Sequence, residues 1–241
     1  MIPLALVPSK RQHSIRSSPF VHNPSPTSLY CIFTIPSDSA MYQTVLVNCN
    51  LVDVLSGAIA KHHYLAIDAN GYIAKFAPMA EAPPDLLQKT RETLDLQNSG
   101  YVVPGLIDCH VHVTAFTANF AELERTSPSY VAATAAKELS ETLRRGFTTV
   151  RDAGGADHGL ARALQEGLIQ GPRLLFCGKA LSQTGGHGDM RSPGDFAKAF
   201  DCTCAGLGRV CDGDVEVRRA ARDEIRKGAT HIKVMVSQLL S

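Results

Sequence analysis

The chain has 241 residues, of which 44% are hydrophobic and 20% charged, and its 24 basic and 23 acidic side chains leave a formal net charge of +1. This composition is typical of a globular protein and lacks the basic excess with which nucleic-acid-binding proteins attract phosphates. A nucleic-acid partner is therefore not expected. No apolar run approaches the roughly 18–20 residues of a membrane-spanning helix, so a membrane partner is not expected either. Seven cysteines, an odd number in a chain too long to depend on disulfides, predict reduced thiols and a cytoplasmic protein.

The first 40 residues are rich in serine and proline, hold three basic residues and one acid, and show no hydrophobic periodicity. This composition predicts a disordered leader over residues 1–40. An organelle transit peptide is the alternative, because such peptides are poor in acids and contain Arg and Ser. Met41 is a candidate translation start.

Residues 41–100 contain short β-type runs that predict a small β-sandwich domain. The runs cover residues 44–47, 51–54, 64–67 and 72–76. Asn70-Gly71 stands between the last two runs and predicts a tight hairpin, because both residues tolerate positive φ. Pro78, Pro83 and Pro84 then predict the end of the sheet.

From residue 101 to residue 241, strand and helix patterns alternate. Expected strands cover residues 102–107, 147–150, 173–177 and 231–236, and expected helices begin at Ser127, Asp157 and Asp214 and end at Gly146, Ile169 and Lys227. Repeated β–α units imply an α/β fold with parallel strands, in an open sheet or a barrel. Between Met190 and Gly213 we expect an irregular insert, whose Cys202, Cys204 and Cys211 lack a fourth ligand at zinc-finger spacing.

Two histidines follow the first of these strands in the run Asp108-Cys109-His110-Val111-His112. Residues i and i+2 of a strand project from the same face, so His110 and His112 are expected side by side where α/β folds hold their active sites. Two imidazoles so placed can bind one metal ion. The alternative is a pair of ordinary surface or core histidines, because a bare His-x-His pattern is common.

Three further polar positions lie within or directly after the expected strands. Lys233 stands between apolar residues, where a lysine either forms an ion pair or, as a neutral amine, reacts with carbon dioxide to give an anionic carbamate ligand. The Gly-rich loop 182–189 predicts a substrate-binding role for His187 at the rim of the site, and a tight surface turn is the alternative. Asp152 is either a partner of the site residues or a turn residue before the next helix.

Four motifs in this order resemble those of the amidohydrolase superfamily, in particular its ochratoxinase-like branch of imidazolonepropionases and Xaa-Pro and Xaa-Arg dipeptidases. The motifs are Val102–His112, Gly146–Asp152, Ser182–Asp189 and His231–Met235. The β-type residues 42–100 are similar to the N-terminal domain of that group. The resemblance implies a (β/α)8 TIM barrel with a binuclear divalent-metal centre, usually zinc. It also implies hydrolysis of amide or peptide C–N bonds in small-molecule amides or dipeptides.

The same resemblance implies roles for individual residues. His110 and His112 bind the more buried metal, and a carboxylated Lys233 bridges the two metals. Two cations that share a water lower its pKa from about 16 to about 7, which gives hydroxide at neutral pH. That hydroxide attacks the carbonyl carbon of the scissile bond.

Residues 101–241 are expected to contain only strands one to four of such a barrel. In the family, histidines after strands five and six hold the second metal and an aspartate after the last strand handles the proton, so no such residue is expected here. We therefore predict a C-terminally truncated domain that is inactive and folds poorly by itself, because its strand edges are open. The alternatives are a non-catalytic half-barrel that binds at most one metal or pairs with a full-length relative, and an open α/β module that binds a nucleotide at residues 184–188.

Overall fold

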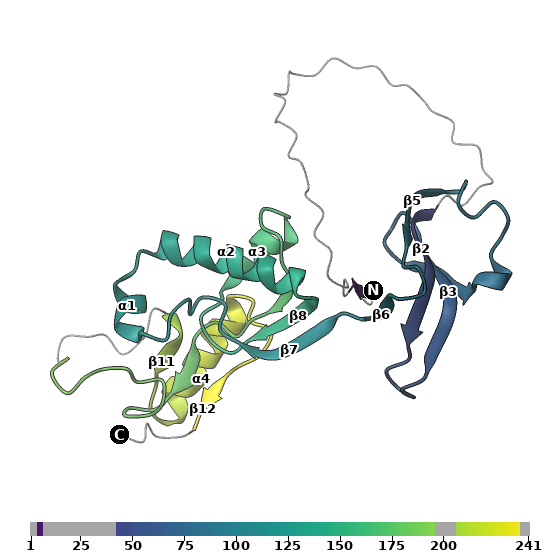
Figure 1. Ribbon diagram of the computed structural model, residues 1–241. Coiled ribbons are helices and arrows are strands. Elements are labelled where there is room, and N and C mark those ends of the chain that lie inside the picture. Colours follow the sequence, from purple (N-terminus) through teal and green to yellow (C-terminus); the bar gives the residue numbers. More distant parts are fainter. Residues whose placement is uncertain (1–3, 7–41, 196–205, 237–241) are drawn as a thin grey trace, which may run out of the picture. The chain divides into compact units, whose positions relative to one another are not determined.

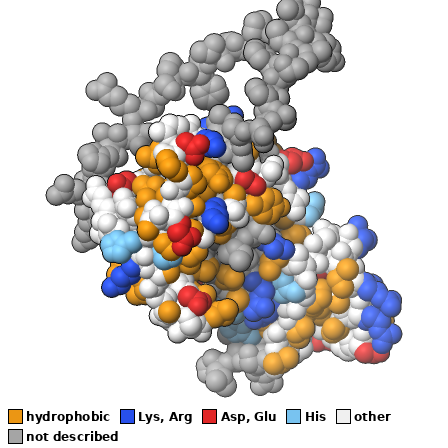
Figure 2. All heavy atoms as spheres, turned by 90° about the vertical axis from the view of Figure 1, so that its right-hand side faces the viewer, with side chains coloured by type: hydrophobic (Ala, Val, Ile, Leu, Met, Phe, Trp, Pro, Cys, Tyr) orange, Lys and Arg blue, Asp and Glu red, His pale blue; other side chains and the backbone are white. Residues whose placement is uncertain are grey.

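The computed structural model describes residues 4–6, 42–195 and 206–236. The chain divides into two compact units, residues 1–104 and 105–241 (Figure 1). None of the helices in the described ranges is long and apolar enough to cross a membrane. On the face seen in Figure 2, basic and acidic side chains both reach the surface, with apolar atoms exposed between them.

The first unit is a β structure built on one sheet. Its elements are β1 (Leu4–Leu6), β2 (Tyr42–Val52), β3 (Ile59–Ile67), β4 (Ile73–Pro78), the 3-10 helix η1 (Met79–Glu81), β5 (Thr90–Asp95) and β6 (Tyr101–Pro104). The strands lie in the order β1-β6-β2-β3-β4, and β5 pairs with β2 as well. β2, β3 and β4 are antiparallel neighbours, whereas β5 and β6 run parallel to β2.

The hairpin predicted at Asn70-Gly71 is confirmed, since it joins antiparallel β3 and β4. Only Gly71 takes a positive φ, of 79°. Asp68 supports the turn, because its carboxylate accepts hydrogen bonds from the backbone N–H groups of Asn70 and Tyr72. The turn therefore needs one left-handed residue and an aspartate.

Other expectations for the first unit are corrected. The two runs 44–47 and 51–54 are parts of the single strand β2, whose pairing with β3 shifts register after Leu46. The prolines do not end the sheet, because β5 and β6 return to it beside β2. Leu4–Leu6, inside the expected disordered leader, form β1 and pair with β6, and the rest of the leader lies outside the described residues.

The core of the first unit covers both faces of the sheet, because alternate residues of a strand point to opposite faces. One cluster of buried residues contains Val45, Val47, Tyr64, Ala66, Ala77 and Leu86. The other contains Leu46, Cys49, Leu65 and Val102. Residues 45–47 and 64–66 alternate between the two clusters, so the central strands are buried on both sides.

The second unit has an α/β fold with parallel strands, as expected. Its elements are β7 (Leu106–Val111), α1 (Phe120–Arg125), α2 (Pro128–Arg144), β8 (Phe147–Asp152), α3 (His158–Gln165), β9 (Arg173–Leu175), β10 (Ala180–Ser182), β11 (Gly208–Val210), α4 (Gly213–Arg226) and β12 (Val234–Met235). The strands form two three-stranded parallel sheets, β7-β8-β9 and β11-β10-β12. Helices α2 and α3 cover β8 and β9 through a buried cluster that includes Leu139, Val150, Ala161 and Leu174.

The expected strand 102–107 is divided at Gly105. β6 belongs to the sheet of the first unit, and β7 belongs to the second. A Cβ atom at Gly105 would lie only 2.1 Å from Oγ1 of Thr148 on β8, so a side chain has no room there. The apolar run that predicts one strand therefore connects two units.

The expected strand 173–177 stops at Leu175, and a further strand, β10, follows after Lys179. The fourth expected strand is reduced to Val234–Met235. The insert expected to be irregular contains β11 and the buried Cys211, whereas Cys202 and Cys204 lie outside the described residues.

The helix starts follow local signals closely, whereas α3 ends at Gln165 and not at the expected Ile169. Pro128 opens α2 after Ser127, as expected, and Gly146 follows its end with a φ of 93°. Asp157 caps α3, where its carboxylate accepts the N–H groups of residues 159 and 160. α4 begins at Gly213, one residue before the expected Asp214, with Asp212 in the N-cap position.

Candidate functional site

His110 and His112 lie at the carboxyl end of β7, next to the carboxyl end of β8. Their ring centroids are 5.4 Å apart and the rings meet edge to face. His110 is exposed, whereas His112 is half-buried. Residues i and i+2 of an extended segment share a face, which explains why the two rings are neighbours.

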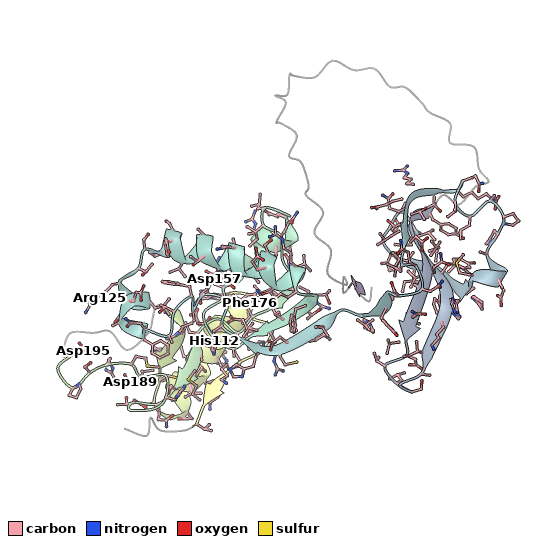
Figure 3. All side chains as sticks on the ribbon, viewed as in Figure 1. His112, Arg125, Asp157, Phe176, Asp189 and Asp195 are labelled. Atoms are coloured by element: carbon pink, nitrogen blue, oxygen red, sulfur yellow. The ribbon has the colours of Figure 1, made fainter. Side chains whose placement is uncertain are left out.

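A backbone carbonyl orients the ring of His112, which Figure 3 labels. Its Nδ1 lies 2.9 Å from the carbonyl oxygen of Gly154, in the loop after β8. A carbonyl oxygen only accepts, so Nδ1 is the donor in this hydrogen bond and Nε2 is left for another partner. Gly154 allows this approach, because a Cβ atom there would lie 2.7 Å from the carbonyl oxygen of Leu207 and 3.6 Å from Cε1 of His112.

Asp152 holds the two loops that surround His112. It is fully buried at the end of β8, and its carboxylate accepts backbone N–H groups from Val113, Gly154 and Ala156 at 2.8 to 3.1 Å. Burial raises the pKa of Asp152, and the three N–H donors and the nearby His112 act in the opposite direction. These three hydrogen bonds all come from backbone N–H groups, so Asp152 fixes the shape of the loops around His112.

A cavity of about 330 Å³ adjoins the histidines. Its lining residues are His112, Ala115, Thr117, Ala118, Phe120, His187, Gly188, Met190, Leu207, Gly208 and Met235. They come from the segment after β7, the loop after β10, the start of β11 and from β12. His112 and His187 therefore face one space, although 75 positions separate them in the sequence.

The loop that carries His187 is fixed from both sides. Arg191 donates hydrogen bonds to both carboxylate oxygens of Asp189 at 2.7 and 2.6 Å, and Asp189 also accepts the N–H of Gly185. Arg191 holds the pKa of Asp189 down at about 2, so this carboxylate is ionised at neutral pH. Asp212, before α4, accepts the N–H and the hydroxyl of Thr184. His187 thus stands at the tip of a loop tied at its base.

Lys233 lies immediately before β12 and is half-buried. Its carbonyl oxygen accepts the N–H of Leu181 at 2.9 Å. The thiol of Cys177 is close to several of these groups: burial raises its pKa to about 12, Asp152 acts in the same direction, and Lys233 lowers it. Lys233 and Asp152 therefore share a neighbour in the interior of the unit.

The donor set fits a divalent metal only in part. Within residues 42–195 and 206–236, no three His, Cys, Asp or Glu side chains lie together as a metal site. His110 and His112 supply two neighbouring nitrogens, and the hydrogen bond from His112 to a carbonyl is the arrangement typical of metal-binding histidines. A third ligand from this part of the chain has to be of another type, and a carboxylated lysine is such a ligand.

Sequence reasoning missed several residues of this site. The carbonyl of Gly154 and the apolar residues Leu207 and Phe120 belong to it through contacts between distant segments. The pair Gly154-Gly155 was the available signal for a close backbone approach. No local pattern marks Leu207, because it stands at the end of the expected irregular insert.

Comparisons with known proteins agree with this architecture. The amidohydrolase family model matches residues 101–240. Ochratoxinase from Aspergillus niger is 35% identical over 177 residues, which cover 68% of this chain and 36% of ochratoxinase. A prolidase solved in complex with N-methylphosphonate-L-proline is 41% identical with a TM-score of 0.71, over 79% of this chain and 46% of the prolidase. The crystal structure of A. niger ochratoxinase shares 31% identity with a TM-score of 0.63, over 81% of this chain and 47% of that structure. The chain thus spans about half, or less, of the length of these relatives.

Proposed function

Because the chain belongs to the amidohydrolase family, we propose that it carries part of the active site of a metal-dependent hydrolase of amide or peptide C–N bonds. His110, His112 and a carboxylated Lys233 would hold the metal, which we propose to be zinc. The observation that carries this proposal is the His112 ring, whose Nδ1 is bonded to Gly154 and whose Nε2 is free beside a cavity. Imidazole nitrogens and a carboxylate-like oxygen suit zinc.

The metal, when bound, polarises the scissile carbonyl and lowers the pKa of a water molecule. The protein residues then have separate tasks. The carbonyl of Gly154 fixes the orientation of His112, and Asp152 holds the loops that bring Gly154 there. We propose that His187, which lines the same cavity as His112, binds the substrate. Small-molecule amides and dipeptides are the proposed substrates.

We propose that residues 101–241 form the first four β/α units of a (β/α)8 barrel. We also propose that residues 41–100, with the one sheet described above, belong to a small β-sandwich domain. Two parallel sheets and the family match support the barrel. The described residues provide at most one set of metal ligands, so we propose that the 241-residue chain alone does not hydrolyse substrate. The second candidate, a non-catalytic half-barrel that binds one metal, rests on the same partial donor set.

A direct test compares two proteins, the 241-residue chain and a chimera in which the C-terminal half of the prolidase relative follows residue 237. Each is loaded with Zn²⁺, its metal content is measured, and a panel of dipeptides and N-acyl amino acids is assayed. We expect hydrolysis by the chimera alone and its loss in His112→Ala. A folded chimera that binds metal and hydrolyses no C–N bond would contradict the proposal.

Lys233 can be tested in the same proteins without an activity assay. Carbon-13 bicarbonate added to the metal-loaded protein should give a carbamate signal in the NMR spectrum that Lys233→Ala lacks. Lys179→Ala, a lysine of the same unit outside the proposed ligand set, is the control and should keep the signal. A signal that survives Lys233→Ala would show that this lysine is not the carboxylated residue.

A further inference from the structure

The wall of the cavity beside His112 is apolar. Six of its lining residues carry apolar side chains: Ala115, Ala118, Phe120, Met190, Leu207 and Met235. The other described residues that line it are two histidines, a threonine and two glycines, and none is Asp, Glu, Lys or Arg. A cavity with this lining favours apolar substrate groups over charged ones.

This wall is firmly supported. Leu207 is buried with Leu123 of α1, and Ala115 and Met190 pack against the same cluster. Asp189 stands between the lining residues Gly188 and Met190, but its carboxylate is buried and pairs with Arg191. The apolar side chains of the wall are therefore part of the packed interior of the second unit.

We infer that the substrate group bound against this wall is bulky, apolar and uncharged, such as an aromatic or branched aliphatic side chain. The inference rests on the proposed function and narrows its substrate class. A charged group placed against these six side chains would lose its hydration and find no Asp, Glu, Lys or Arg side chain of opposite charge among the described lining residues. An apolar group would be removed from water, which favours binding.

The size of the cavity agrees with this class. An engineered cavity of roughly 150 Å³ is enough to bind benzene. The cavity here measures about 330 Å³, so it holds a ring or a branched chain together with the neighbouring amide. Substrates with a lysine, arginine, aspartate or glutamate side chain at this position are excluded by charge.

Binding can be measured independently of turnover. The 241-residue chain is titrated with N-acetyl-L-phenylalanine amide, N-acetyl-L-leucine amide, N-acetyl-L-aspartate amide and N-acetyl-L-lysine amide by ligand-observed NMR. We expect the phenylalanine and leucine probes to bind at least 10-fold more tightly than the two charged probes. Equal affinities, tighter binding of a charged probe, or no binding of the phenylalanine probe would overturn the inference.

Substitutions locate the binding to this wall. Met190→Glu should weaken the phenylalanine probe at least 10-fold, whereas Met190→Leu, of similar volume, should leave it unchanged. If Met190→Glu does not fold, Phe120→Glu replaces it, because Phe120 is 42% exposed and tolerates a polar residue more easily. Unchanged affinity in the glutamate variant would refute the assignment of the probe to the wall.

The probe-binding test and the hydrolysis test of the proposed function can fail separately. Selective binding of apolar probes in a protein whose chimera shows no hydrolysis would uphold the inference and reject the activity. Hydrolysis by the chimera with a preference for charged side chains would uphold the activity and reject the inference.

Discussion

The two units bury different kinds of residue. Among the described residues, six of the seven buried polar or charged side chains belong to the second unit: Thr114, Thr148, Asp152, Ser182, Asp189 and Glu224. The first unit has only Asn50. Buried polar groups are costly unless hydrogen bonds satisfy them. Asp152 and Ser182 are the last residues of β8 and β10, and this part of the second unit is where the candidate site lies.

The first unit has a different irregularity. All four non-glycine residues with positive φ in the described ranges belong to it: Asn48, His62, Gln97 and Asn98. They are joined by hydrogen bonds, such as that between Nδ1 of His62 and Oδ1 of Asn98 at 2.7 Å. Strained backbone therefore occurs apart from the candidate site, and buried polar groups are the better guide to function here.

The largest expected effect comes from matched histidine substitutions in the two units. His112→Ala should lower the zinc affinity of the protein by more than about 100-fold, because even the partners of metal-binding histidines are worth 10–100-fold. His63→Ala, which removes a ring stacked on Phe76 at 4.7 Å in the first unit, should leave zinc affinity unchanged. Competition with a chelating dye measures both. Equal zinc affinities in the two variants would contradict the assignment of the metal site to the second unit.

The second effect concerns carboxylates. Asp152→Asn turns one oxygen, which accepts the N–H of Val113, into a donor, and we expect a loss of about 2 kcal/mol in the free energy of unfolding. In Asp95→Asn the remaining carbonyl oxygen can still accept the bonds that now go to Oδ1, so a much smaller loss is expected. Urea denaturation compares the two. Losses of equal size would show that the buried carboxylate contributes no more than the exposed one.

The third effect depends on pH. Arg191 lowers the pKa of Asp189 from its ordinary value of 3.8 to about 2, so the ionised carboxylate stabilises the folded state above pH 4. This stabilisation, about 2 kcal/mol, is lost as the pH falls from about 4 to 2. The difference in unfolding free energy between the wild-type protein and Asp189→Asn should therefore shrink over that range. A difference that is constant with pH would contradict the shift.

Local patterns predicted what local forces determine. The Asn70-Gly71 hairpin and the Ser127-Pro128 helix start were found because turn and cap residues act within a few positions. β5 and β11 were missed, because each is held by a strand far away in the sequence. A short strand has too few residues to show a hydrophobic period, and it forms because another strand pairs with it.

The same reasoning applies to the candidate site. Spacing on one strand was sufficient to place His110 beside His112. The orientation of His112 depends on Gly154, 42 positions later, and on a loop shape that Asp152 holds from within. Likewise the lack of room for a side chain at Gly105 follows from the position of Thr148 on another strand. Such contacts between segments arise from packing, which a single sequence does not display.

The smallest expected effect tests the strained backbone of the first unit. Gln97 has a φ of 51° and is exposed, and its N–H donates to Asp95. A left-handed residue costs about 1 kcal/mol, and glycine removes that cost but adds up to about 1 kcal/mol of chain entropy, so Gln97→Gly should stabilise the protein by about 0.5 kcal/mol or less. Gln97→Ala keeps the strain and should give no gain. Zinc affinity should be unchanged in both, because strain at this position serves only the local fold. A change in zinc affinity with Gln97→Gly would connect the strained cluster to the site and overturn the separation of the two units.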